Sequence, residues 1–261
     1  MKRLIYQVYL GRPSKLYDCC TESVKSYCAA YGIDHVIQKQ PILKIKPDVF
    51  ATNRSKESYE KHGGFLPIYE KENAFDYFKD YDQIAIVDAD IWIRPDSPNI
   101  FESLDPDADF AGVIEREMPI QSWYQQKIKN YSAMQYSNLH NKSLDFSPNN
   151  LGYEFYNMGL MVMNKSITKY LKGQTAHQFI TRTEFKDFID GQGAWKWSTD
   201  QTLLNYWVRK EKMKQQHLDW KWNALYTAVK NPQDAYFVHF FLKDKLPNRG
   251  ENIQELLKAV A

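Results

Sequence analysis

Two aspartates, Asp88 and Asp90, lie within an apolar stretch of the chain, Ile84-Ala85-Ile86-Val87-Asp88-Ala89-Asp90-Ile91-Trp92-Ile93. A short apolar run of this kind predicts a strand buried on both faces, in the middle of a sheet. Carboxylates at i and i+2 of a strand point to the same side, so their charges repel unless a cation offsets them. A divalent metal ion is the usual partner. The alternative is that both aspartates end the strand at the surface and cap the next segment of the chain.

Composition narrows the class of protein. The 261 residues contain no linker, repeat or low-complexity tract, so we expect a single domain over 1–261. The net charge of +2 is too small to indicate nucleic-acid binding. The opening run is interrupted by Gly11 and Pro13, which predicts neither a signal peptide nor a membrane span. Cys19, Cys20 and Cys28 all fall in one expected helix, which indicates reduced thiols and a cytoplasmic protein.

Several elements are expected to position the aspartates. A strand over 4–10, a helix from Ser14 to Gly32 and a strand over 35–37 form a β-α-β opening, which indicates a parallel sheet. A helix from Pro67, with Ile68, Phe75 and Phe78 on one face, leads to the aspartate strand. Further strands are expected over 109–114, 158–163 and 236–240, an extended piece at 220–222, and helices after 198 and over 253–260. The pattern predicts an α/β fold with a mostly parallel central sheet flanked by helices. Residues 115–155 have weak periodicity and are either functional or poorly ordered.

Four further segments of the chain resemble motifs of sugar-transferring enzymes. The run from Tyr156 to Asn164 resembles the N-x-G-hydrophobic-N strand of retaining, metal-dependent glycosyltransferases with the GT-A fold. Thr199-Asp200-Gln201-Thr202-Leu203-Leu204-Asn205 resembles their D-Q-x-x-L-N helix start. His239 and Lys245 resemble the C-terminal H-x-x-G-x-x-K-P stretch of the glycogenin and galactosyltransferase-like family, with Leu242 in place of its Gly. The first strand is more similar to the Och1-type sugar transferases that carry a DXD motif.

The resemblance implies a role for each matching position. Asp88, Asp90 and His239 would bind a divalent cation, and Lys245 would hold the diphosphate of a nucleotide-sugar donor. The other implied donor-binding residues are Gln7, Val8 and Tyr9 along the base, Lys71 and Ala89 near the aspartates, and Asn157 and Gly159 beside the sugar. Asp200 would also lie beside the sugar and Gln201 near the anomeric carbon, which makes these two the catalytic candidates. Segment 236–261 would close the site.

The chemistry of the residues agrees with these roles. Transfer from a nucleotide diphosphate sugar, most simply a UDP-sugar, leaves a diphosphate whose developing charge needs stabilisation. Hard carboxylate oxygens hold a metal that can supply it, and the imidazole of His239 favours Mn²⁺ over Mg²⁺. Such a site is expected at the carboxyl ends of parallel strands. The acceptor would be a hydroxyl of a glycan or another molecule, with retention of configuration by same-face attack. Asp200 is the alternative nucleophile for a double displacement.

Each residue also has a simpler interpretation. His239 can be a hydrogen-bonded core histidine, Gln201 can form a capping box with Ser198, Gly159 can permit close packing, and Lys71 can be a surface residue. Two other functions stay open. One is a sugar-1-phosphate nucleotidyltransferase, which would release pyrophosphate from a nucleoside triphosphate. The other is a non-catalytic relative that binds glycans without metal or nucleotide.

Overall fold

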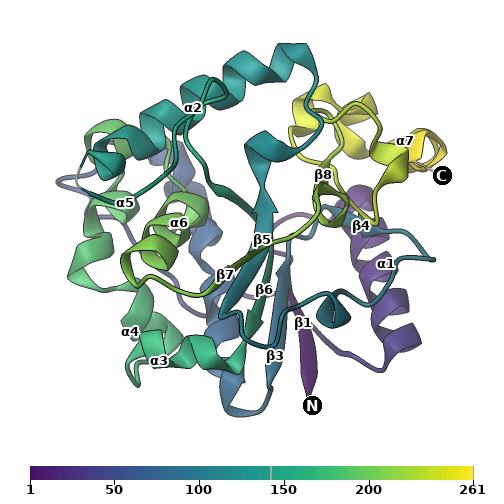
Figure 1. Cartoon of the computed structure of the whole chain (residues 1–261). Helices are drawn as coiled ribbons and strands as arrows, with labels where there is room; N and C mark the ends of the chain where they lie inside the picture. Colours follow the sequence, from purple (N-terminus) through teal and green to yellow (C-terminus); the bar gives the residue numbers. More distant parts are fainter. Residues whose placement is uncertain (142, 261) are drawn as a thin grey trace.

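A six-stranded sheet lies at the centre of the part of the chain that the computed structural model describes, residues 1–141 and 143–260 (Figure 1). Its strand order is β2-β1-β3-β6-β5-β7. The strand bounds are β1 Arg3–Val8, β2 Asp34–Gln38, β3 Gln83–Val87, β5 Phe110–Ile114, β6 Tyr156–Asn164 and β7 Gln215–His217. Strand β6 is antiparallel to β3 and β5, and the other neighbours are parallel. The predicted α/β fold with a mostly parallel sheet is therefore confirmed. Lys142 and Ala261, which fall in the predicted segments 115–155 and 236–261, lie outside the described residues.

Helices lie on both sides of this sheet. Figure 1 shows α1 and α7 on one side and α3 to α6 on the other, with α2 crossing one end. Their bounds are α1 Lys15–Tyr31, α2 Ser122–His140, α3 Thr168–Leu171, α4 Ala176–Ile180, α5 Lys186–Asp190, α6 Asp200–Lys210 and α7 Ile253–Val260. Helix α1 ends where the sequence predicts, at Gly32, whose φ of 63° is left-handed. No helix in the described ranges is both long enough and apolar enough to cross a membrane.

The predicted single strand over Ile84–Ile93 is wrong, because the chain leaves the sheet after Val87. The Asp88 N–H donates to the Gly159 carbonyl at 2.8 Å, and the Ile91 N–H donates back to the Asp88 carbonyl at 3.1 Å. The chain therefore turns at Asp88–Asp90, and Asp is a poor strand former. It then enters β4 Ile91–Ile93, which belongs to a second sheet with the order β4-β9-β8. The bounds of the partners are β8 Ala224–Leu225 and β9 Phe237–His239.

The segment predicted as a helix from Pro67 forms two tighter 3-10 helices, Pro67–Tyr69 and Lys71–Lys79. Phe75 and Phe78 are buried as the pattern predicts, whereas Ile68 is only half-buried. This segment comes directly before β3, and its first residues lie beside the turn at Asp88. The sequence pattern therefore predicts the presence of a helix here correctly, but not its type.

Residues 115–155 contain a helix that the periodicity did not predict. The buried face of α2 includes the polar side chains of Ser132 and Gln135 between its apolar members, so the apolar stripe in the sequence is interrupted. The predicted extended piece at Trp220 and Trp222 is also wrong, because Trp220–Trp222 is a 3-10 helix capped by Asp219. In the second place the Asp219 side chain, which accepts from the Lys221 N–H, caps the helix.

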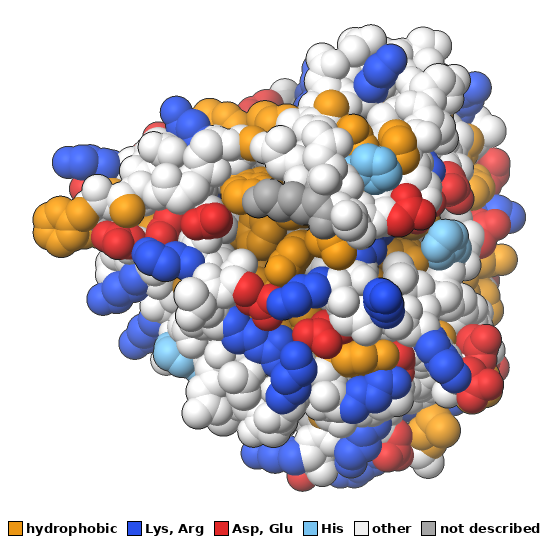
Figure 2. Space-filling view, turned by 60° about the vertical axis from the view of Figure 1, so that its left-hand side comes forward, with side chains coloured by type: hydrophobic (Ala, Val, Ile, Leu, Met, Phe, Trp, Pro, Cys, Tyr) orange, Lys and Arg blue, Asp and Glu red, His pale blue; other side chains and the backbone are white. Residues whose placement is uncertain are grey.

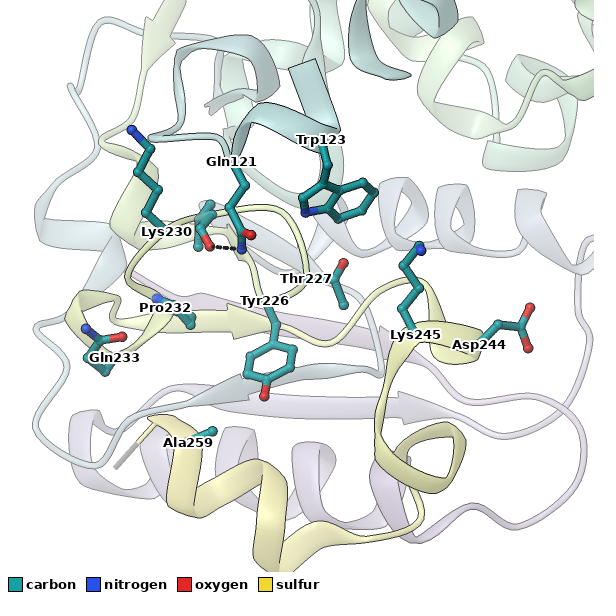
Figure 3. Close-up of a pocket in the computed structure, with 11 residues that line it drawn as sticks. Gln121, Trp123, Tyr226, Thr227, Lys230, Pro232, Gln233, Asp244, Lys245 and Ala259 are labelled. Atoms are coloured by element: carbon teal, nitrogen blue, oxygen red, sulfur yellow. Dashed lines mark hydrogen bonds between the residues drawn. The ribbon is translucent and has the colours of Figure 1, made fainter. Parts of the chain in front are cut away.

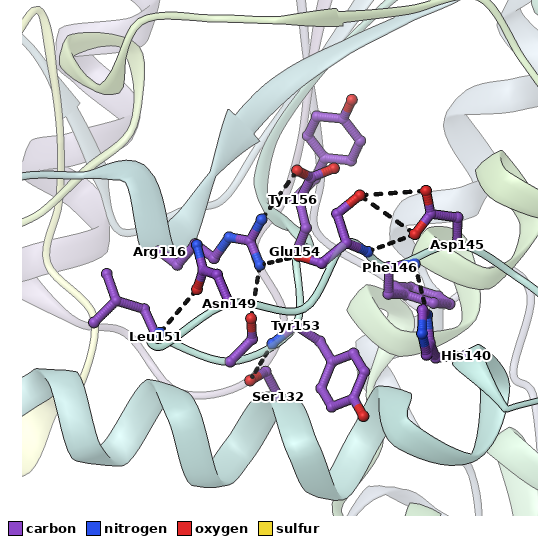
Figure 4. Close-up of polar contacts among 12 residues, drawn as sticks. Arg116, Ser132, His140, Asp145, Phe146, Asn149, Leu151, Tyr153, Glu154 and Tyr156 are labelled. Atoms are coloured by element: carbon purple, nitrogen blue, oxygen red, sulfur yellow. Dashed lines mark hydrogen bonds and ion pairs between the residues drawn. The ribbon is translucent and has the colours of Figure 1, made fainter.

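The chain between α2 and β6 is held against the sheet by buried charges (Figure 4). Arg116 donates to the carbonyls of Ser147 and Gly152, each at 2.6 Å, and pairs with Glu154 at 3.3 Å. Glu154 also pairs with Arg209 of α6 at 3.2 Å. These contacts anchor the loop to the 3-10 helix Glu115–Glu117, which follows β5, and to α6.

Charges of both signs are distributed over the molecular surface. Figure 2 shows basic and acidic side chains interspersed on the face that is turned forward. The scattered Lys and Arg of the sequence therefore stay scattered on this face of the folded chain. Cys19, Cys20 and Cys28 are unbridged thiols on α1, and the last two are buried.

Candidate metal centre

Asp88, Asp90 and His239 meet at the carboxyl end of β3, at the middle of the central sheet. Pairing of β4 with β9 sets Ile91 opposite His239, and the Phe240 N–H donates to the Asp90 carbonyl at 2.9 Å. Nε2 of His239 lies 3.3 Å from Asp90 Oδ1 and 3.8 Å from Asp88 Oδ2. One ligand atom from each residue lies within 4.8 Å of the others. Two carboxylates and an imidazole at this spacing can hold one divalent cation.

The charges within this cluster favour ionised carboxylates. Burial alone would raise the pKa of Asp90, but the His239 imidazole outweighs burial and lowers it. Burial likewise would lower the pKa of His239, but the Asp90 and Asp88 carboxylates outweigh it and raise that pKa. A divalent cation bound at this place would be attracted by the same two carboxylates.

Lys71 connects the cluster to helix α6. Its Nζ lies 2.8 Å from Asp88 Oδ1 and 2.7 Å from Asp200 Oδ2, and it donates to the Met158 carbonyl at 3.0 Å. Its side chain is only 12% exposed, so the interpretation of Lys71 as a surface residue is wrong. Burial alone would lower its pKa, but the carboxylates of Asp200 and Asp88 outweigh burial and raise it. Lys71 is therefore a fixed cation that orients both acids.

Glu72 is a buried carboxyl beside this ion pair. No described residue donates a hydrogen bond to either of its oxygens. Burial, together with the nearby Asp200, raises the pKa of Glu72 well above its usual range. Burial therefore favours the neutral, protonated form of this carboxyl group in the folded protein.

We expect the Glu72→Gln substitution to stabilise the protein increasingly as the pH rises. Because the folded-state pKa is raised, the folded protein retains a proton that the unfolded chain releases, and stability falls above the unfolded pKa. This loss, which the variant lacks, amounts to at most about 1.4 kcal/mol per pH unit. The measurement is the free energy of unfolding in urea at acidic and at neutral pH. The exposed Glu60 supplies the control Glu60→Gln, which should show no such divergence. Parallel pH profiles for the two variants would contradict the assignment.

Asn157, Gly159 and Gln201 lie beside the cluster, with their polar groups engaged within the protein. Asn157 Oδ1 accepts from the Gly159 N–H at 3.0 Å, and its Nδ2 donates to Glu115 at 2.7 Å. Gly159 permits close packing, because a β-carbon there would lie 2.6 Å from Nδ1 of His239. Gln201 Oε1 accepts from the Met158 N–H at 3.1 Å. The predicted capping box of Gln201 with Ser198 is wrong, because Thr199 caps α6.

A pocket of about 270 Å³ opens over the aspartates. Its lining residues are Val8, Leu10, Tyr17, Pro67, Ile68, Lys71, Asp88, Ala89, Asp90 and Asp200. Gln7 and Tyr9 are not among them. Gln7 Nε2 donates to the Asp88 carbonyl at 3.2 Å, and the Tyr9 hydroxyl donates to Asp18 at 3.0 Å, so both support the rim of the pocket. Leu10 and Tyr17 were not predicted as site residues from the sequence, although the segment after the first strand is where sheets of this class bind ligands.

Lys245 lies away from this pocket. It lines a separate hollow of about 760 Å³, where its Nζ is 4.9 Å from the centre of the Trp123 ring (Figure 3). Lys243, in contrast, lies near the pocket over the aspartates. Its Nζ is 3.6 Å from the centre of the ring of Tyr17, which lines that pocket. Leu242 keeps the left-handed backbone that a Gly would favour, with a φ of 58°. The turn after β9 therefore holds its shape without the glycine.

No protein-family model matches the chain, and no curated protein is significantly similar in sequence. Solved structures are similar in fold. A glycosyltransferase involved in the glycosylation of the major capsid of PBCV-1 has a TM-score of 0.58 at 14% identity, over 97% of this chain and 100% of that one. Mouse xyloside xylosyltransferase 1 gives 0.53 at 11% identity, over 95% and 100%. The galactosyltransferase LgtC, in complex with donor and acceptor sugar analogs, gives 0.53 at 12% identity, over 98% and 95%. The chain thus has the GT-A fold of these enzymes.

Proposed function

We propose that this protein is a metal-dependent glycosyltransferase that moves a sugar from a nucleotide diphosphate sugar, most simply a UDP-sugar, to a hydroxyl acceptor. The observation that carries the proposal is the cluster of Asp88, Asp90 and His239 at the carboxyl end of β3. In an open, mostly parallel sheet, ligands bind at this end of the strands. The likeness in fold to glycosyltransferases supports the same function.

The residues of the cluster fit a divalent cation. Asp88, Asp90 and His239 would hold Mn²⁺, or Mg²⁺ as the alternative, with carboxylate and imidazole ligands. A bound cation supplies Lewis-acid stabilisation of the negative charge on a leaving diphosphate. Lys71 keeps the Asp88 carboxylate oriented at 2.8 Å, which leaves its second oxygen toward the cluster.

The donor would occupy the pocket over the aspartates. Val8, Leu10 and Tyr17 offer apolar and aromatic surface for the base, and Ala89, between the two acids in the sequence, also lines the pocket. We assign the contact with the diphosphate to Lys243 in preference to Lys245. Lys243 adjoins Tyr17 of the pocket, whereas Lys245 adjoins Trp123 of the other hollow.

We propose that transfer occurs with retention, by attack on the face that the diphosphate leaves. The bond from the anomeric carbon to the phosphate oxygen breaks, the bond to the acceptor oxygen forms, and the acceptor proton passes to the departing phosphate oxygen. Asp200 is paired with Lys71 at 2.7 Å, which makes it a poor nucleophile and favours this route over a double displacement. Gln201, Asn157 and Gly159 would shape the sugar side of the site. We also propose that 1–261 is a single domain and that segment 236–261 closes the site.

The test is a donor screen with the purified protein. We expect one UDP-sugar, in the presence of Mn²⁺, to raise the melting temperature and to be slowly hydrolysed, with release of UDP that a chelator abolishes. Release of pyrophosphate from a nucleoside triphosphate and a sugar phosphate would instead show a nucleotidyltransferase. Binding of glycans that needs neither metal nor nucleotide would show a non-catalytic relative. Either outcome would refute the proposed function.

A further inference from the structure

We propose that Asn223 is a positioning residue that keeps His239 ready to bind a metal. Nδ1 of His239 lies 3.1 Å from Asn223 Oδ1, and Nε2, on the other side of the ring, lies 3.3 Å from Asp90 Oδ1. The hydrogen bond at one ring nitrogen decides which nitrogen carries the proton of a neutral imidazole. An acceptor at Nδ1 therefore leaves the Nε2 lone pair directed at the aspartates. The inference rests on the proposed metal site.

The orientation of the Asn223 amide is determined by its neighbours. Its Nδ2 lies 2.9 Å from Asn157 Oδ1 and 3.2 Å from the Asn157 carbonyl oxygen. A backbone carbonyl can only accept a hydrogen bond, so the Asn223 NH₂ group must face Asn157. The Asn223 carbonyl oxygen then faces His239 and can only accept. Nδ1 of His239 is consequently the donor.

The orientation of Asn157 is determined in the same way. The Gly159 N–H, which can only donate, lies 3.0 Å from Asn157 Oδ1. The Asn157 NH₂ group therefore turns to Glu115 Oε2, at 2.7 Å. Glu115 accepts a further hydrogen bond from the Tyr124 hydroxyl at 2.6 Å. The backbone carbonyl of Asn157 and the backbone N–H of Gly159 fix the direction of this chain of hydrogen bonds, whatever the protonation state of Glu115.

Close packing restricts the orientation of the His239 imidazole. His239 is 5% exposed and Asn223 is fully buried. A β-carbon on Gly159 would lie 2.6 Å from Nδ1 of His239 and closer still to Cε1, so the imidazole lies directly against the Gly159 backbone. Gly159 thus positions the ring, and Asn223 selects its tautomer. The sequence offers no signal for Asn223, which is far from the other motifs in the chain.

The test compares Asn223→Leu, which removes the acceptor, with Asn164→Leu. Asn164 is the last residue of β6, at the end of the strand away from Asn157 and Gly159. Asn164 is a matched control because its buried amide also makes several hydrogen bonds, to Gln83, Asp105 and Ala108. Mn²⁺ binding to each protein is measured by electron paramagnetic resonance. We expect Asn223→Leu to weaken Mn²⁺ binding about 10- to 100-fold and Asn164→Leu to leave it unchanged. At saturating Mn²⁺, the spin-echo modulation from a ligated imidazole nitrogen should weaken only in Asn223→Leu.

Two further variants keep the inference falsifiable. Asn223→Asp retains an oxygen acceptor for Nδ1. With its second carboxyl oxygen protonated to donate to Asn157, it should recover part of the Mn²⁺ affinity, which a purely structural role of the amide would not predict. Asn223→Ala replaces Asn223→Leu if the latter does not fold. Equal Mn²⁺ affinity and an equal nitrogen signal in wild type and Asn223→Leu would overturn the positioning role while leaving the metal site intact. Absence of Mn²⁺ binding in the wild type would overturn the metal site itself, and with it this inference.

Discussion

An Asp90→Asn variant should lose both Mn²⁺ binding and sugar transfer while remaining folded. Asp90 Oδ1 is the oxygen nearest to Nε2 of His239, at 3.3 Å, and the substitution replaces this anionic ligand with a neutral amide. Removing one stabilising group of this kind typically lowers kcat about 10²- to 10³-fold, and loss of the metal removes more. The fold should survive, because the amide keeps the shape of the side chain, and relief of the repulsion from Asp88 offsets part of the lost pairing with His239.

Thermal unfolding with and without Mn²⁺ separates these effects. A ligand that binds only the folded state stabilises it by about 2.7 kcal/mol at a hundred times its Kd, and Asp90→Asn should lose this gain. Its melting temperature without metal should stay close to that of the wild type. Asp96→Asn is the control, because Asp96 is an exposed acid on the same stretch of chain. If Asp90→Asn keeps the Mn²⁺-dependent stabilisation, the cluster is not the metal centre.

The alternation of apolar segments was enough to predict five of the six strands of the central sheet, but not β7. Runs such as Met158–Met163 are apolar because both faces of β6 are covered, and burial leaves a clear signal in the sequence. The same signal was misleading at Ile84–Ile93. Two short strands in different sheets are both buried there, so the apolar run continues across the turn that separates them. Hydrophobicity alone does not distinguish one long strand from two short ones.

The contacts that orient the site could not be predicted in this way. Asn223 and Glu115 act through hydrogen bonds between elements far apart in the chain, and a single polar residue has no period. The choice between Lys243 and Lys245 depends on the path of the turn after Leu242, where a non-glycine residue takes a positive φ. Spacing in the sequence identified which residue types gather at the end of β3. Three-dimensional packing decides which of them face the pocket.

Lys71→Met is expected to destabilise the protein by about 3–5 kcal/mol, because it leaves the buried Asp200 carboxylate without its cation. The ammonium group of Lys71 contacts Asp88 at 2.8 Å and Asp200 at 2.7 Å, and the Asp200 side chain is only 8% exposed. Activity should fall as well, because the Asp88 carboxylate loses the contact that orients it. The contribution should be constant at neutral pH. Because the pKa of Lys71 is raised in the folded protein, its stabilisation is complete below the pKa of the unfolded chain and is lost above it, as the pH rises toward the raised value.

A double-mutant cycle distinguishes this ion pair from simple packing of the lysine stem. In Lys71→Met/Asp200→Asn the buried charge disappears together with its cation, so the double variant should regain stability, with a coupling of about 1–3 kcal/mol in urea unfolding. Lys169→Met is the matched control. Lys169 is 53% exposed, and its partner Asp109 keeps hydrogen bonds from Ser166, Tyr170 and Lys214, so the loss there should be about 1 kcal/mol or less. If the double variant is as unstable as the sum of its parts, Lys71 contributes through packing, and its charge does not organise the site.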